Sequence, residues 1–185
     1  MNPFAYLVDT LFNLYIMVVL LRLWLQWARA DFYNPFSQFI VKITQPILAP
    51  MRKVIPSVGG IDLATVVLAY VLVLVKFILL QSILTSGEML FSPSYLWISA
   101  LSLLKSAGSL VFWILLIRAL MSWVSQGRSP IEYVMNQLTE PMCAPIRRIL
   151  PEMGGLDLSI LVIFIGLQFA NYLMGSLVGM IWYSL

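Results

Sequence analysis

The chain has 185 residues, of which 61% are hydrophobic and 10% are charged, and its formal net charge is +3. So few charges cannot cover a water-facing surface, and the composition predicts a membrane protein whose solvent is the bilayer. The chain has no histidine and one cysteine, Cys143, which excludes Ser–His or Cys–His catalysis, histidine-ligated haem, an intrachain disulfide and a thiolate metal cage. We therefore expect a non-enzymatic protein with no catalytic residues, no cofactor and no metal site, which binds no nucleic acid.

Four long apolar segments are separated by more polar ones. The first, 6–27, would extend about 33 Å as a helix, which is enough to cross a hydrocarbon core. No basic residue precedes it and no small-residue cleavage pattern follows, so we interpret it as a span and not as a signal peptide. The other three spans are 61–84, 95–123 and 157–184.

A segment of twenty residues occurs twice, and this repeat decides how the whole chain is interpreted. Residues 44–63 and 139–158 are 95 positions apart and identical at ten of twenty positions. The similarity extends into the spans, because Arg22 to Trp27 corresponds to Arg118 to Trp123. We therefore expect two repeats, 1–90 and 91–185, each made of a span, a loop and a returning span. An even number of spans per repeat gives both hairpins the same orientation in the membrane, as parallel repeats.

The basic residues indicate which side the loops face. The two long loops, 28–60 and 124–156, contain seven Lys or Arg residues in total, whereas the termini and the central turn contain none. The positive-inside rule therefore predicts cytoplasmic loops, with both termini on the opposite side of the membrane.

Each long loop also carries apolar residues at helical spacing opposite polar ones, which predicts amphipathic helices in the membrane interface. We expect the prolines within them to break each into two short helices. These prolines are Pro46 and Pro50 in the first loop and Pro141 and Pro145 in the second.

The doubled pattern P-x-x-x-P-x-R-[KR]-x-x-P-x-x-G-G-x-D, the Arg-x-x-x-x-Trp ends of spans one and three, and the Asn-Pro-Phe and Ser-Pro-Ile-Glu-Tyr segments resemble the YggT family of bacterial inner-membrane proteins. The resemblance covers nearly the whole chain. It implies a four-span protein of the bacterial inner membrane, but no catalytic residues. Combined with the orientation predicted from the loop charges, an inner-membrane protein would have both termini in the periplasm. Members are associated with osmotic or ionic stress tolerance and potassium uptake, and photosynthetic relatives with cytochrome assembly and division.

The repeated segment supplies two kinds of candidate site. The basic pairs Arg52–Lys53 and Arg147–Arg148 either contact anionic lipid headgroups or an acidic partner, or serve only as orientation signals. Asp62 and Asp157 follow Gly-Gly and open spans two and four, so we interpret them as helix N-caps. A cation site built from both aspartates is the alternative.

Charged residues inside the spans are the other candidates. Arg22 and Arg118 lie near span ends, where they either snorkel to the interface or line a polar groove. Lys76 and Lys105 are costly in an apolar span, and the repeat offset relates their positions to Asn171 and Asp9. We expect either a polar cluster of these four residues, in which Asp9 neutralises one lysine and Asn171 hydrogen-bonds the other, or two independently snorkelling lysines.

Small residues in the fourth span predict close helix contact. Gly175 and Gly179 form a Gly-x-x-x-Gly pair, which permits close approach of another helix either within the chain or in a homo-oligomer.

Two functions remain. In the first, the protein supports osmotic or ionic stress tolerance, including potassium handling, as the resemblance implies. In the second, it is a scaffold or assembly factor for other membrane proteins in division or cytochrome assembly. The intramembrane lysines disfavour a simple cation pore, because a fixed positive charge raises the barrier to potassium.

Overall fold

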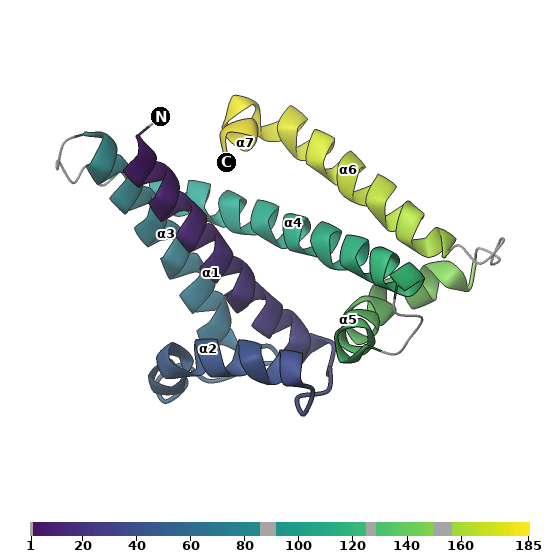
Figure 1. Ribbon diagram of the computed structural model, residues 1–185. Helices are drawn as coiled ribbons and strands as arrows, with labels where there is room; N and C mark the ends of the chain where they lie inside the picture. Colours follow the sequence, from purple (N-terminus) through teal and green to yellow (C-terminus); the bar gives the residue numbers. More distant parts are fainter. Residues whose placement is uncertain (1, 86–91, 125–128, 150–156) are drawn as a thin grey trace. The chain divides into compact units, whose positions relative to one another are not determined.

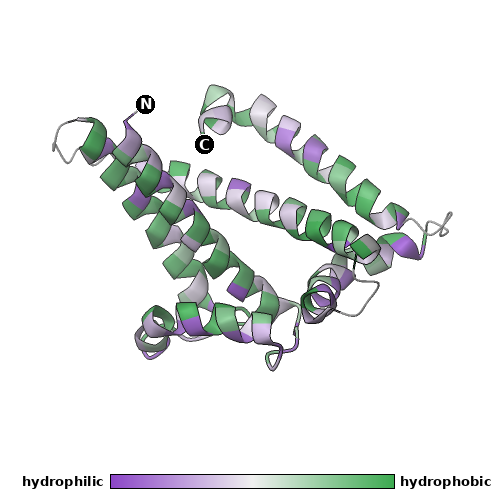
Figure 2. Cartoon of the chain, in the orientation of Figure 1, coloured by the Kyte–Doolittle hydropathy of each residue, from purple (hydrophilic) through white to green (hydrophobic). Residues whose placement is uncertain are grey.

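The computed structural model describes residues 2–85, 92–124, 129–149 and 157–185, and these residues form helices and turns without a strand. Four helices are long and apolar enough to cross a bilayer, and hydrophobic residues dominate them in Figure 2. The prediction of an all-helical fold is therefore confirmed for the described residues, and four of the helices are candidate spans. The helices, labelled in Figure 1, are α1 (Pro3–Trp27), α2 (Pro35–Met51), α3 (Leu63–Leu84), α4 (Ser94–Val124), α5 (Pro130–Arg147), α6 (Leu158–Val178) and α7 (Met180–Ser184).

The chain divides into two compact units. Unit 1 consists of Met1–Leu23 and Ile40–Ala107, and unit 2 of Trp24–Phe39 and Gly108–Leu185. Unit 1 therefore includes the first part of α4, and unit 2 includes the last turn of α1 and the start of α2. The expected repeat boundary after residue 90 stays a prediction, and each unit is described by itself below.

In unit 1, α1 and α3 lie side by side, and α2 crosses their lower ends in Figure 1. Each helix contributes apolar residues to one buried core. The start of α4 packs on α3, where the Tyr95 ring stacks on Phe77 with centroids 6.4 Å apart and the Tyr70 hydroxyl donates to the Leu96 carbonyl (2.8 Å). The core residues are Ile16, Val19 and Leu20 of α1, Ile40 and Leu48 of α2, and Ala64, Leu68, Ala69 and Val73 of α3.

In unit 2, the segment after α1 is held against α5 by two hydrogen bonds. The Asp31 amide donates to Gln137 Oε1 (2.9 Å), and Asn34 Nδ2 donates to the Pro130 carbonyl (2.8 Å). Asn34 also caps α2 by accepting from the Phe36 amide (2.9 Å). The core of this unit includes Leu110, Ile114 and Leu115 of α4 and Val134, Met135 and Leu138 of α5.

The prolines do not break the loop helices, contrary to our expectation. Helix α2 continues through Pro46 and Pro50, and α5 continues through Pro141 and Pro145. All four prolines are exposed. The four-residue spacing puts each pair on one side of its helix. On an exposed side, a carbonyl that loses its backbone partner to proline can bond to solvent or headgroups instead. The cost of each proline is therefore too small to end the helix.

The fourth spanning helix is shorter than the expected segment 157–184. Helix α6 ends at Val178, because Gly179 adopts a φ of +74° that favours glycine. The five residues of α7 then turn back on α6, where Trp182 Nε1 donates to Asn171 Oδ1 (2.8 Å). A polar residue inside α6 thus fixes the C-terminal turn.

Candidate functional site

The repeated segment of unit 1 forms a polar cluster with the end of α1, here called the first-repeat cluster (Arg22, Thr44, Arg52 and Asp62). The buried Arg22 donates to Thr44 Oγ1 (3.1 Å) and to Gln45 Oε1 (3.0 Å) of α2. Arg52 Nε donates to Asp62 Oδ2 (2.9 Å), and Arg52 Nη2 contacts the same oxygen. Two arginines therefore connect α1 to α2, and the end of α2 to the start of α3.

The equivalent residues of unit 2 form the second-repeat cluster (Arg118, Thr139, Arg147 and Asp157). Arg118 of α4 donates to Thr139 Oγ1 of α5 (2.5 Å), and Arg147 donates to Asp157 Oδ2 (2.8 Å). Arg118 also reaches Asp157 (3.4 Å). The two copies thus share an arginine–threonine bond and an arginine–aspartate bond at equivalent positions, and the second copy adds a direct link between the two bonds.

The two copies differ at the residue after the threonine. In unit 1 this is Gln45, which accepts from Arg22. In unit 2 it is Glu140, which pairs with Arg147 (3.2 Å) and also lies 4.0 Å from Arg118, the equivalent of Arg22. The second-repeat cluster also contains Cys143, whose Sγ accepts from Arg118 (3.3 Å). Cys143 is buried, and burial raises the pKa of its thiol despite the neighbouring Ser159 and Arg118, so this cysteine stays protonated and shielded in the folded protein.

The two aspartates occupy the N-cap positions of α3 and α6 but use their carboxylates differently. Asp157 accepts the Ser159 amide (3.1 Å), as a capping side chain does. Asp62 is fully buried and has the extended backbone of an N-cap, but its carboxylate makes no capping bond. It instead accepts from Arg52 and from Thr65 Oγ1 (2.6 Å). Asp62 belongs to unit 1 and Asp157 to unit 2, and the cation site made of both aspartates stays a hypothesis.

The arginine contacts keep these carboxylates ionised. Burial raises the pKa of Asp62, but hydrogen bonds from Thr65 and Arg52 outweigh it, so the pKa lies below the ordinary value of 3.8. The pKa of Asp157 is also lowered, because Ser159 and Arg147 outweigh its burial. Burial would lower the pKa of Arg147, but the Asp157 and Glu140 carboxylates reverse this and raise it. Each cluster is therefore a set of mutually stabilised charges.

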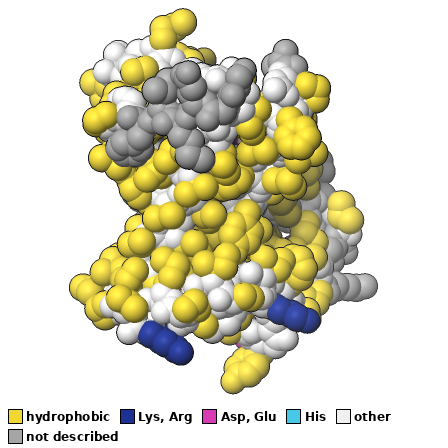
Figure 3. All heavy atoms as spheres, turned by 90° about the vertical axis from the view of Figure 1, so that its left-hand side faces the viewer, with side chains coloured by type: hydrophobic (Ala, Val, Ile, Leu, Met, Phe, Trp, Pro, Cys, Tyr) yellow, Lys and Arg dark blue, Asp and Glu magenta, His cyan; other side chains and the backbone are white. Residues whose placement is uncertain are grey.

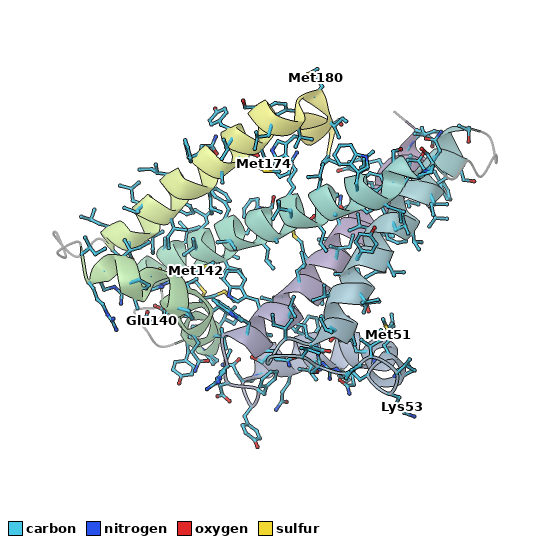
Figure 4. The ribbon with its side chains drawn as sticks, turned by 180° about the vertical axis from the view of Figure 1, so that it is seen from behind. Met51, Lys53, Glu140, Met142, Met174 and Met180 are labelled. Atoms are coloured by element: carbon cyan, nitrogen blue, oxygen red, sulfur yellow. The ribbon has the colours of Figure 1, made fainter. Side chains whose placement is uncertain are left out.

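The two members of each basic pair have different surroundings. Arg52 and Arg147 turn towards the aspartates, whereas Lys53 and Arg148 are exposed, and the Lys53 side chain extends away from the end of α2 in Figure 4. Within the part of the chain that the structure describes, neither Lys53 nor Arg148 forms an ion pair.

A second polar group lies inside the spans of unit 1. Lys76 of α3 is buried and its Nζ lies 3.1 Å from Asp9 Oδ1 and 2.9 Å from Asn13 Oδ1, both on α1. Asn13 Nδ2 in turn donates to Asp9 Oδ2 (3.0 Å). We call these three residues the intramembrane triad. The sequence reasoning paired Asp9 with a lysine but missed Asn13, although it follows Asp9 by one helical turn and shares its face.

The second lysine of the expected cluster, Lys105, belongs to α4, and its place in such a cluster stays a prediction. Its neighbours Leu104 and Ala107 line an apolar groove of about 490 Å³ together with Val66 and Val67 of α3. Asn171 belongs to unit 2 and accepts from Trp182. Of the four residues expected in one cluster, Asp9 and Lys76 lie together.

The two glycines of the Gly-x-x-x-Gly pair also have separate roles. A Cβ at Gly175 would collide with the Tyr183 hydroxyl of α7, so this glycine permits close contact within the chain. Gly179 lies at the turn after α6. A Cβ at Gly166, which is exposed on α6, would meet no atom within 4 Å.

These features define a class: an all-helical multi-pass membrane protein in which two copies of one proline-rich segment form equivalent arginine–aspartate contacts. A model of the CCB3/YggT family matches residues 1–83 and 97–178. The chain belongs to the CCB3/YggT family.

Individual relatives agree with this family. The chain is 67% identical over 185 residues to "Uncharacterized protein in proC 3'region" of Vibrio alginolyticus, with 100% of both chains covered. It is 53% identical over 172 residues to "Uncharacterized protein YggT" of Escherichia coli (strain K12), covering 92% of this chain and 88% of the relative. A Haemophilus influenzae protein is 38% identical over 178 residues, covering 96% and 94%. No solved structure matches the chain.

Proposed function

We propose that this protein is a non-enzymatic scaffold or assembly factor of the bacterial inner membrane, which supports tolerance of osmotic or ionic stress through a partner membrane protein. The observation that carries the proposal is that charged side chains of the spans are bonded to polar partners on neighbouring helices. Lys76 forms an ion pair with Asp9 and a hydrogen bond with Asn13. Arg22 and Arg118 donate hydrogen bonds to threonines of α2 and α5. Charges that bind one another hold helices in place, whereas a transport path needs groups that can exchange partners with the transported ion.

The exposed surface of α6 is the proposed partner contact. In the most apolar stretch of α6, only 11% of the residues are buried, compared with 22% to 33% in the equivalent stretches of the other spans. Its residues Leu161, Ile165, Phe169 and Tyr172 recur at helical spacing and are 54% to 68% exposed. A face of this kind can receive an apolar helix of another membrane protein.

A flux assay tests the scaffold against the alternative in which this chain itself handles potassium. The purified full-length protein is placed in liposomes, and potassium flux is compared with that of empty liposomes. We expect no difference under a potassium gradient or an osmotic step. Potassium flux that rises with the amount of protein would refute the scaffold.

Photo-crosslinking in cells tests the partner. A photoreactive residue replaces Phe169 on α6, and a matched control replaces Val71, which is exposed on α3 of unit 1 (42%). We expect Phe169 to capture the same membrane protein repeatedly, with a yield that changes under osmotic stress, whereas Val71 does not. Equal, non-selective capture from both positions would contradict the proposal. Cys143 is unsuitable as the crosslinking position because it is fully buried.

A further inference from the structure

The basic pairs have separable functions, because their first residues are already engaged within the fold. Arg52 and Arg147 hold the aspartates that open α3 and α6. The second residues, Lys53 and Arg148, are exposed at equivalent positions. Any contact of the pair with something outside the fold therefore falls to the second residue.

A strongly exposed apolar residue follows each of these exposed cations. Val54 is 83% exposed after Lys53, and Ile149 is 83% exposed after Arg148. An aliphatic side chain this far out of the fold is unfavourable in water, because its apolar surface stays hydrated. Both copies thus expose a cation followed by an aliphatic residue at equivalent positions, which indicates that both surfaces contact the same kind of environment.

Helix α2 extends this surface in unit 1. It buries Ile40, Thr44 and Leu48 against the unit. Ile43 and Ile47 precede two of these residues by one position and are therefore rotated by about 100° from them, and they are exposed (37% and 41%). Lys42, one position earlier still, is exposed as well. Around the helix, the buried core side is thus followed by exposed aliphatic groups and then by a cation. In a membrane interface, the aliphatic groups would face the acyl chains and the cation the headgroups.

The face that Figure 3 shows agrees with this arrangement, because its Lys and Arg atoms lie near the lower edge, beneath a broad band of hydrophobic atoms. We propose that Lys42, Ile43, Ile47, Lys53 and Val54 form an interfacial anchor that binds the anionic headgroups of the bilayer, with Arg148–Ile149 as its counterpart in unit 2. The cations attract the phosphate groups, and the aliphatic side chains insert at the acyl boundary. This proposal is independent of the scaffold function, so the flux assay does not bear on it.

Fluorescence quenching in vesicles tests the anchor. The background carries Cys143→Leu, the residue found at the equivalent position 48, and Val54→Cys labelled with an environment-sensitive dye. The full-length protein is placed in phosphatidylcholine vesicles with or without about one third phosphatidylglycerol, and quenching by nitroxide lipids and by aqueous iodide is measured. With phosphatidylglycerol, we expect more nitroxide quenching, less iodide quenching and a blue-shifted emission. Salt at about 1 M should reverse these changes, because it screens the exposed charges.

The charge requirement is tested in the same background with Lys42→Gln and Lys53→Gln. Each lysine should change the lipid-bound population of the label about fivefold, the equivalent of ~1 kcal/mol. The control is Arg29→Gln, another exposed cation outside the surface, which should leave the phosphatidylglycerol effect intact. A label that remains accessible to iodide in both vesicles would overturn the proposal and leave the surface open to a soluble acidic protein. An unchanged phosphatidylglycerol response in the double variant would overturn it too.

Discussion

Breaking the Arg52–Asp62 pair should destabilise unit 1 far more than removing the neighbouring Lys53. Asp62 is completely buried, and its bonds come from Arg52 and Thr65. Arg52→Ala would leave a buried carboxylate with one hydroxyl donor, for which about 3–5 kcal/mol is typical. Because the Arg52 side chain is 32% exposed, water can partly replace it, so we expect the lower limit, about 3 kcal/mol. In a protein of this size, that lowers Tm by about 6–12 °C.

A double-mutant cycle separates the pair from its surroundings. Asp62→Asn keeps the shape of the side chain and removes its charge, at an expected cost of about 1.5 kcal/mol. The double variant should be less destabilised than the sum of the single variants, because neither charge is then left alone. The control, Lys53→Ala, removes an exposed cation one position away and should change stability by less than ~0.5 kcal/mol.

Thiol reactivity provides the assay, because a buried cysteine reacts with a dye only when the fold opens. Cys143 reports on unit 2, so the reporter is moved to unit 1 with Leu48→Cys and Cys143→Leu; both positions are fully buried. Thermal unfolding of the four variants is then compared in one detergent. If Arg52→Ala unfolds at the same temperature as Lys53→Ala, the reasoning from burial is refuted.

Three further predictions concern other contacts. Lys76→Met should lower the stability by about 2–3 kcal/mol, because it leaves the Asp9 carboxylate without its cation. Adding Asp9→Leu should restore most of the lost stability in the same thermal assay. If it restores none, Lys76 and Asp9 do not act as an ion pair. The pKa of Asp157 lies below 3.8, so its ionised carboxylate stabilises the fold above pH 3.8, and this stabilisation is lost as the pH falls through the lowered pKa. Asp157→Asn should therefore flatten the dependence of stability on pH between about pH 5 and 2. An unchanged pH dependence would refute this prediction. Gly166→Ala should stabilise α6 by ~0.5–1 kcal/mol, whereas Gly175→Ala should be less stable than Gly166→Ala because Tyr183 must move; equal Tm values would exclude close contact at Gly175.

Hydropathy and length alone predicted the four spans, because crossing a bilayer is a local requirement on about twenty consecutive residues. Comparison of residues 44–63 with 139–158 likewise revealed the duplication and the family without any structure. The excess of Lys and Arg in the two long loops predicts their cytoplasmic side, and that orientation stays a prediction.

The local sequence pattern did not predict the helix boundaries where a distant residue or access to solvent determines them. Pro46 and Pro50 predicted a broken helix, but their exposed position lets α2 continue. The fourth apolar run gave no sign of its end at Val178, because a single glycine φ angle and the Trp182–Asn171 bond determine it.

The sequence by itself determined the composition, the membrane class, the span count and the equivalence of the two copies. Only the tertiary structure decided which charge binds which partner. Arg22 and Thr44 are 22 positions apart, and Lys76 and Asn13 are 63 apart. Such pairs depend on how helices pack, and a repeat pattern does not encode that directly. The division of labour between Arg52 and Lys53 has the same origin: two adjacent cations are alike in sequence, but one of them lies within reach of a buried carboxylate.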